Sequence, residues 1–188
     1  MATQGELMTA FHFAKHWNSE DDLAIEDWFR IGMARNVPAP LPMPVGRHLN
    51  LGAGNKQIGQ AIPLDLEHGW DANKELIPCA DETVAGIWAN HFLEHVKNPV
   101  AVLRECERVL EVGGVLNVVL PHAMSQLKAA DITHEWNHNF TEETWRHLIG
   151  NQYFTAPTGT AWALQVHTCF IMGVSWANLA LFTQLVKQ

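Results

Sequence analysis

A glycine turn and an acidic residue close to it could form a nucleotide site. The segment HLNLGAGNKQIGQAIPLDLEH, residues 48–68, places Gly52 and Gly54 directly after one apolar stretch and Asp65 at the end of the next. Glycine lets the backbone turn sharply and lets a ligand approach without a Cβ in the way. A carboxylate in the position of Asp65 can accept both hydroxyls of a ribose. The pattern indicates a nucleotide-type site, with an ordinary tight turn and a helix N-cap at Asp65 as alternatives.

Histidine is the second residue type here that could do chemistry. The chain has 11 histidines, of which His122 ends an apolar stretch and His134 lies in the polar segment DITHEWNHNF. A histidine that titrates near neutral pH is a natural general base for an alcohol or a phenol. We therefore take His134 and His122 as candidate catalytic residues, and a hydrogen-bonded loop residue is the alternative for each.

A metal site in the same region is weakly indicated. Its ligands would come from five side chains, Asp131, His134, Glu135, His138 and His122. A helical HxxxH or HExxH pair is the usual core of such a site. His134 and His138 have the HxxxH spacing, but the residues between them favour a loop. We predict no metal.

The elements that would position these residues alternate between strands and helices. Apolar stretches predict strands at residues 47–51, 61–66, 83–89 and 115–120, and the last is the continuous run expected of a strand buried on both faces. Asn98 as N-cap and Pro99 at the first helical position predict a helix to about Glu111, ended by Gly113 and Gly114. Two closing strands are predicted at residues 162–172 and 178–187.

This order predicts an α/β fold. We expect a Rossmann-like, doubly wound and mainly parallel sheet with an antiparallel C-terminal hairpin. The gap between Gly52 and Asp65 is too short for a full helix and two turns, so the first crossover helix is predicted to be abbreviated. A further helix is expected from Thr141 to Gly150.

Two regions are expected along the chain. Residues 1–44 contain a helix that begins near Ser19 and the proline-rich connector VPAPLPMP, and we interpret them as an N-terminal helical lid or appendage. Residues 45–188 would form the main domain. A length of 188 residues with 47% hydrophobic residues is enough for one domain with a sizeable core.

Charge and cysteine content narrow the classes of partner. The net charge is -8 and the Lys and Arg residues are scattered, which makes nucleic acid an unlikely partner. Three widely separated cysteines and no CxxC indicate neither a disulfide framework nor a zinc knuckle. No signal peptide is recognised, and the longest apolar run is too short to cross a bilayer. We expect a cytoplasmic protein with no membrane partner, and a homodimer is left open.

Three stretches of the chain together match a known family pattern. They are LNLGAG with IPLDL at residues 49–66, ANHFLEHVKNP at residues 89–99, and ERVLEVGGVLNVVLPH at residues 107–122. They resemble the class I S-adenosylmethionine-dependent methyltransferases, and more narrowly the methyltransferase type 11 branch. The HFLEH and RVLEVGG runs are far more specific than the glycines, and the resemblance covers about residues 47–150.

The resemblance implies a site for S-adenosyl-L-methionine, with S-adenosyl-L-homocysteine as the product. The glycine turn would pass beneath the methionine part of the cofactor, and the acid after the second strand would hold the ribose. A second acid would reach the adenine. The end of the third strand would border the amino-acid end of the cofactor and its sulfonium. The residues in these positions are Gly52, Ala53 and Gly54, then Asp65 and Leu66, then Asp71 and Ala72, and finally Asn90 and His91. Asp81 is the alternative to Asp71, and Glu94 and His95 are interpreted as capping and packing residues.

Two positions depart from the family pattern. Asn50 stands where the family commonly has an acid, and Lys56 stands at the third glycine position. Asn50 could still hydrogen-bond the ammonium group of the cofactor, but without a charge.

The resemblance implies an S-adenosylmethionine-dependent methyltransferase acting on oxygen or nitrogen of a small-molecule acceptor. The alternative suggested by Asn50, Lys56 and the short crossover is an S-adenosylmethionine-binding module with little or no catalysis that acts within a complex. A nicotinamide-dependent oxidoreductase could use the same turn, but the missing third glycine and the HFLEH and RVLEVGG runs count against it.

Overall fold

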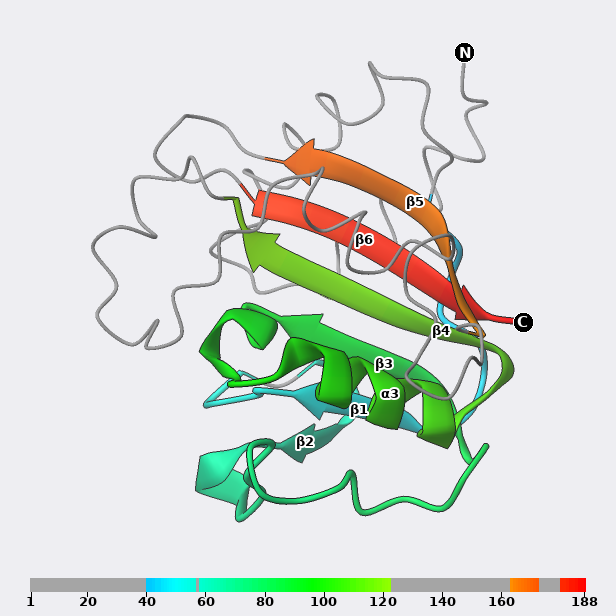
Figure 1. Ribbon diagram of the computed structural model, residues 1–188. Helices are drawn as coiled ribbons and strands as arrows, with labels where there is room; N and C mark the ends of the chain where they lie inside the picture. The colour runs from blue at the N-terminus through cyan, green and yellow to red at the C-terminus, as the bar shows by residue number, and fades with distance from the viewer. Residues whose placement is uncertain (1–39, 57, 123–162, 173–179) are drawn as a thin grey trace.

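Six strands form one mixed sheet in the computed structural model, which describes residues 40–56, 58–122, 163–172 and 180–188 (Figure 1). The strand order is β2-β1-β3-β4-β6-β5. The strands are β1 His48–Leu51, β2 Ile62–Leu64, β3 Val84–Asn90, β4 Leu110–Pro121, β5 Leu164–Met172 and β6 Ala180–Lys187. Strands β1 to β4 run parallel, β6 is antiparallel to β4, and β5 is antiparallel to β6. The predicted Rossmann-like sheet with an antiparallel C-terminal hairpin is confirmed.

Strands β3 and β4 form the buried centre of the sheet. Residues 84–89 are all buried, and so are residues 115–121 of β4. Their Val, Leu and Ile side chains face both layers of the core, as a continuous apolar run predicts for a central parallel strand. The sequence pattern therefore identified the centre of the sheet correctly.

Helix α3, Pro99–Val109, covers one face of the sheet (Figure 1). Its N-cap is Asn98, whose side chain accepts a hydrogen bond from the Ala101 N–H at 3.2 Å, as predicted. Its buried stripe includes Val102, Leu103 and Cys106, which pack into the main core.

The end of this helix differs from the prediction. Helix α3 ends at Val109, and the next residue already belongs to β4. Gly113, at φ 81°, and Gly114 lie inside β4, where the register with β3 shifts between Val84 and Gly86. A Cβ on Gly114 would lie 2.8 Å from the Glu111 carbonyl oxygen. The glycine pair therefore makes a bend in the strand and does not terminate the helix.

The other face of the sheet carries the end of the proline-rich connector. Gln184 of β6 bonds both backbone groups of Leu41: its Oε1 accepts from the Leu41 N–H at 2.7 Å, and its Nε2 donates to the Leu41 carbonyl at 3.0 Å. Gln184 also donates to Asn117 Oδ1 at 2.9 Å, and the Asn117 amide lies 2.8 Å from Met43 Sδ. Residues 40–44 are thus fixed on the face opposite α3 by a buried polar network.

Two connections are shorter than in a full doubly wound fold. In the described residues between β1 and β2, 52–56 and 58–61, the chain forms turns and no helix, so the predicted abbreviated crossover is confirmed. Residues 65–83 contain only the 3₁₀ helix η1, Leu66–His68, and turns, with no strand. A second 3₁₀ helix, η2, covers Leu93–His95.

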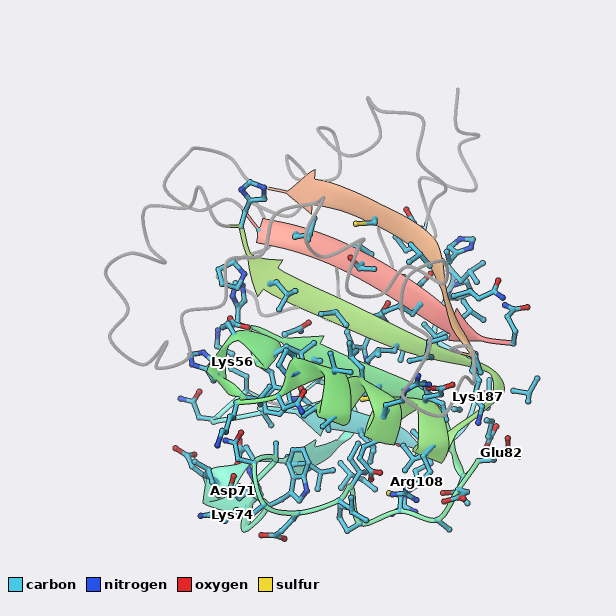
Figure 2. The ribbon with its side chains drawn as sticks, viewed as in Figure 1. Lys56, Asp71, Lys74, Glu82, Arg108 and Lys187 are labelled. Atoms are coloured by element: carbon cyan, nitrogen blue, oxygen red, sulfur yellow. The ribbon has the colours of Figure 1, made fainter. Side chains whose placement is uncertain are left out.

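Arg108 holds the strandless segment against the helix (Figure 2). Its guanidinium donates to the Ile77 and Cys79 carbonyls at 2.9 Å each and to the Asp81 and Glu105 carboxylates. The hydrogen bonds that Arg108 donates to Glu105, and then to Asp81, raise the pKa of Arg108 further above its usual value. One side chain on α3 therefore satisfies carbonyls that have no strand partner.

Several predictions fall outside the described residues. These are the helix near Ser19, the helix from Thr141 to Gly150, and the N-terminal lid as a whole, so the boundary between residues 1–44 and 45–188 stays a prediction. No helix in the part of the chain that the structure describes is long and apolar enough to cross a membrane.

Candidate active site

The four parallel strands end at the same edge of the sheet. Register pairs place Leu51 beside Leu64 and Ala89, and Asn90 beside Val119. The segments that follow these strands are the glycine turn, Asp65, the stretch from His91 to His95, and His122. In open α/β sheets, ligands bind outside the carboxyl ends of the strands. This edge therefore brings together most of the residues that the sequence singled out.

The glycine turn depends on its two glycines. Gly52 has φ 66° and Gly54 has φ 50°, both in the left-handed region that a side chain disfavours. The Gly52 N–H donates to the Leu64 carbonyl at 2.8 Å, which ties the turn to the end of β2. A Cβ on Gly52 would lie 2.5 Å from Phe92 Cδ2, whereas one on Gly54 would meet nothing within 4 Å. Gly52 is thus required both by conformation and by close contact with the loop after β3.

Asp65 connects the glycine turn to η1. One carboxylate oxygen accepts from the Gly54 N–H, and the other accepts from the His68 N–H at 2.9 Å and lies 2.7 Å from His68 Nδ1. Partial burial alone would raise the pKa of Asp65, but hydrogen bonds from the His68 side chain and backbone and from Gly54 lower it on balance. The helix N-cap considered from sequence is present, and the same carboxylate lies against the second glycine.

Asn50 and Lys56 meet each other across the turn. The Asn50 amide donates from Nδ2 to the Lys56 carbonyl at 3.0 Å, and the Asn50 residue is only 3% exposed. Lys56 in turn donates its backbone N–H to the Ala53 carbonyl at 2.8 Å. An aspartate could not donate this bond. The amide therefore closes the shortened turn, which explains in physical terms why an asparagine suits this position.

The predicted adenine-side residues lie in a turn after η1. Asp71 accepts from the Asn73 N–H at 2.9 Å and pairs with Lys74 at 2.8 Å, and Figure 2 labels this pair. The hydrogen bond from Lys74, and then that from Asn73, lower the pKa of Asp71. Ala72 packs against the core, Leu66 is 74% exposed, and the alternative acid Asp81 lies at the surface on Arg108. Contact of Asp71 or Leu66 with a nucleoside stays a prediction.

The loop after β3 carries an unusual group of polar side chains. His91 has φ 49°, a conformation rare for a residue with a side chain, and its N–H donates to the Val119 carbonyl at 2.9 Å. Asn90 Oδ1 and both carboxylate oxygens of Glu94 are buried and accept no hydrogen bond. The sequence interpretation of Glu94 as a capping or packing residue missed this, because burial of a charge is not visible in a motif.

The structure describes one of the two candidate catalytic histidines. His122 directly follows β4 and is 6% exposed, so it lies at the same edge of the sheet. His134 lies outside the described residues. Across residues 40–56, 58–122, 163–172 and 180–188, no group of three His, Cys, Asp or Glu side chains is arranged to hold a metal ion.

Aromatic packing beneath the site was not predicted from the sequence. Trp70 and Phe92 lie with ring centroids 6.0 Å apart, and the Trp70 indole donates to the Leu76 carbonyl at 3.0 Å. These rings join the turn after η1 to the loop after β3 and to Gly52. The two segments are far apart in sequence, and only the fold brings them into contact.

Comparison with protein families identifies the domain. Residues 54–118 match the family Methyltransf_11, described as a methyltransferase domain. The match covers about a third of the chain, and over this segment the chain resembles methyltransferase domains. The matched segment contains Gly54, Asp65, Asn90 and the HFLEH run described above. A search of curated proteins found no significant match.

Solved methyltransferase structures share the fold over nearly the whole chain. An S-adenosylmethionine-dependent methyltransferase from Thermotoga maritima has a TM-score of 0.55 at 14% identity and covers 96% of this chain and 99% of its own. One from Aquifex aeolicus has a TM-score of 0.54 at 13% identity, with 95% and 98% covered. A chain from the complex of the Haloferax volcanii Trm112 methyltransferase activator with a methyltransferase has a TM-score of 0.52 at 14% identity, with 99% and 97% covered. At these identities the likeness establishes the fold.

Proposed function

We propose that this protein transfers the methyl group of S-adenosyl-L-methionine to an oxygen or nitrogen atom of a small-molecule acceptor. The observation that carries the cofactor part of the proposal is the junction of Gly54 with Asp65. It places a glycine turn and a carboxylate together at the carboxyl ends of β1 and β2. That arrangement suits a ribose next to a backbone that a ligand can approach closely.

Each part of this edge has a proposed task in binding. Asp65 would exchange its bond with Gly54 for the ribose hydroxyls, while His68 keeps it in place. Gly52, Ala53 and Gly54 would lie beneath the methionine part, and Asn90 and His91 would border its amino-acid end. Asp71 and Ala72, with the exposed Leu66, would flank the adenine.

A small acceptor agrees with the charge of the molecule. The net charge of -8 opposes binding of a polyanion. The bound cofactor supplies an electrophilic methyl carbon, and the protein has mainly to hold the acceptor atom in line with that carbon. Such positioning contributes up to roughly 7–11 kcal/mol of barrier lowering. His122, at the end of β4, and His134 are proposed to border the acceptor.

Titration of the cofactor product into the protein tests the proposal. S-Adenosyl-L-homocysteine should bind with micromolar affinity, and NAD should not bind. The Asp65→Ala variant should bind at least about tenfold more weakly, because it loses charge-assisted hydrogen bonds of roughly 1.5–3 kcal/mol each. Glu111→Ala is the control, since the Glu111 side chain is exposed and lies near the start of β4, at the opposite end of that strand from the proposed site. Equal affinity in wild type and Asp65→Ala would remove Asp65 from the site.

A binding module within a complex is the second candidate. Asn50 uses its amide to close the turn, which leaves the cofactor ammonium without the usual acid, and the Haloferax volcanii neighbour was solved with an activator protein. Incubation with labelled S-adenosyl-L-methionine and a broad panel of alcohols, phenols and amines separates the two candidates. Methylated product supports the enzyme, and tight binding without any product favours the module.

A further inference from the structure

The Glu94 carboxylate is buried without a hydrogen bond beside two histidines. Its side chain is 1% exposed, and neither oxygen has a hydrogen-bond partner. Its Oε1 lies 3.3 Å from His91 Nδ1 and 3.9 Å from His95 Nε2. Burial of a carboxylate costs several kcal/mol unless an opposite charge or a hydrogen bond compensates for it. Packing alone does not account for Glu94, because an apolar side chain would avoid this cost.

The burial of Glu94 restricts how it can act. A ligand at the edge of the sheet cannot reach an oxygen that has no exposed surface. The imidazole of His91, in contrast, is 50% exposed. Any effect of Glu94 on a ligand must therefore pass through a histidine, and His91 is the closer and the more exposed of the two.

His91 lies at the edge of the sheet where the ligand is proposed to bind. It directly follows Asn90 at the carboxyl end of β3, and its neighbour Phe92 packs against Gly52 of the glycine turn. Its φ of 49° departs from the conformation that a histidine prefers, so the backbone is strained at this residue. Backbone strain of this kind persists only where the surrounding structure imposes it, and it is common at active sites.

We propose that His91 is the general base of the methyl transfer and that Glu94 positions it. Glu94 keeps the proton of the neutral imidazole on Nδ1, which leaves the lone pair of Nε2 free to face the acceptor. As the acceptor oxygen or nitrogen bonds the methyl carbon, its proton moves to Nε2 of His91. The electron pair of the broken carbon–sulfur bond stays on sulfur, which becomes the neutral thioether. The contact at 3.3 Å would shorten in the loaded enzyme, as catalytic hydrogen bonds commonly do.

This inference rests on the proposed function and assigns an acceptor class to it. A base is needed only for an acceptor that must lose a proton during attack, such as an alcohol, a phenol or a protonated amine. A neutral tertiary amine or a thioether would not need one. His91 and Glu94 therefore indicate a hydroxyl or N–H acceptor.

The tautomer of His91 can be measured without knowing the acceptor. Nitrogen-15 spectra of histidine-labelled protein should show neutral His91 protonated on Nδ1. In Glu94→Gln, which keeps the size of the side chain and removes its charge, the spectra should show a larger share of the Nε2-protonated form. His95→Gln is the matched control, and it should leave the His91 signals unchanged. An Nε2-protonated His91 in the wild type, or no change in Glu94→Gln, would overturn the role of Glu94.

Chemical modification tests the position of His91 and its reactivity. Diethylpyrocarbonate should acylate His91 in the wild type, and Glu94→Gln should slow this by about tenfold, the effect expected when one charge-assisted hydrogen bond is lost. His68, whose side chain is 37% exposed and pairs with Asp65, is an internal reference in the same peptide maps. S-Adenosyl-L-homocysteine should protect His91 from the reagent.

The outcomes separate the inference from the proposed function. Binding of S-adenosyl-L-homocysteine without protection of His91 would overturn the inference alone. Absence of binding would overturn the proposed function, and the inference with it. If His122→Asn abolishes turnover of an identified acceptor while His91→Gln retains it, the base is His122 and the inference is wrong.

Discussion

At the residue scale, Asp65 joins the glycine turn to η1 with one carboxylate, and its contact with a ribose stays a prediction. Its bonds to His68 cap η1, and its bond to Gly54 holds the glycine turn against β2. The sequence offered the cap and the ribose ligand as alternatives, since either needs an acid at the end of a strand. The structure shows that the cap does not exclude the other role, because each oxygen has its own partner.

The lowered pKa of Asp65 predicts a dependence of stability on pH. Because the folded pKa of Asp65 lies below the ordinary value of an aspartate, the carboxylate contributes stability that is complete above about pH 4 and is lost as the pH falls through the folded pKa. Asp65→Asn should therefore be less stable than wild type at neutral pH, and the difference should shrink below that range. Urea unfolding at a series of pH values measures it. A difference that stays constant down to pH 2 would contradict the predicted linkage.

A second residue-scale prediction compares the two glycines of the turn. Gly52→Ala and Gly54→Ala both force alanine into the left-handed region, which costs roughly 1–2 kcal/mol. Only Gly52→Ala also adds a contact of 2.5 Å with Phe92. We expect Gly52→Ala to lower the free energy of unfolding clearly more than Gly54→Ala and to weaken cofactor binding. Thermal unfolding and calorimetric titration of both variants measure this, and equal losses would show that the contact with Phe92 is relieved without cost.

At the element scale, the segment between β2 and β3 is held by a side chain in place of strand pairing. Arg108 provides donors to Ile77, Cys79, Asp81 and Glu105 from the last turn of α3. The sequence predicted strands at residues 61–66 and 83–89 and none between them. It did not identify Arg108 as the residue that holds this segment, because the RVLEVGG motif does not reveal what its arginine contacts.

Replacing Arg108 by methionine tests this support. The change keeps most of the length of the side chain and removes its donors. The Ile77 and Cys79 carbonyls lose the hydrogen bonds from Arg108, and Ile77 keeps the one from the Cys79 N–H. We expect the free energy of unfolding to fall by about 1–3 kcal/mol, with the side chain only 28% exposed. Lys74→Met is the control, because the Lys74 side chain is 77% exposed and its ion pair with Asp71 is screened by solvent, so its loss should change stability little. Equal effects of the two changes on urea unfolding would reject the special role of Arg108.

The prediction of helices and strands was correct where local signals determine the structure, and it was wrong where tertiary packing determines it. The N-cap at Asn98 and the buried run of β4 were readable, because capping and hydrophobic patterning are local. The end of α3 was misplaced because a glycine pair can stop a helix or bend a strand. Here the glycine pair bends a strand: a Cβ on Gly114 would lie too close to the Glu111 carbonyl, and the register with β3 shifts nearby. Both observations depend on the sheet and are not visible in the sequence.

At the scale of the whole molecule, the connector and the final strand are joined by a buried amide. Gln184 holds the backbone of Leu41 from 143 positions along the chain, with Asn117 beside it. Proline at positions 38, 40, 42 and 44 predicted a stiff extended connector, but not where it lies. The connector docks on Gln184 and Asn117, two polar residues in the middle of neighbouring strands. Strand propensities disfavour such residues, so the sequence did not indicate this docking site.

Loss of the Gln184 amide should release this connector. Gln184→Leu leaves the Leu41 backbone groups and Asn117 without their partner, so we expect a loss of about 1–3 kcal/mol of unfolding free energy. The Leu41 amide should also exchange with solvent much faster. Gln165→Leu on β5 is the control, because Gln165 is exposed. Unchanged exchange at Leu41 in Gln184→Leu would mean that other contacts hold residues 40–44.

The candidate site was predictable in its parts and not in its connections. Motifs singled out Gly52, Gly54, Asp65 and His91 one by one as candidates, and their contacts with a ligand stay predictions. The bond from Asn50 to Lys56, the packing of Phe92 on Gly52 and the buried Glu94 were not predictable, because each depends on segments meeting across the sheet.

The position of β6 has a consequence for the order in which the chain can fold during synthesis. This strand emerges from the ribosome after the other five strands, yet it lies inside the sheet between β4 and β5. Until residues 180–187 are available, β4 exposes an unpaired buried edge, β5 has no neighbour, and the connector at Leu41 has no anchor. Contacts between distant parts of a chain form late and slowly, and an exposed strand edge favours aggregation. A nascent chain stalled before residue 180 should therefore depend on chaperones far more than one stalled after residue 188.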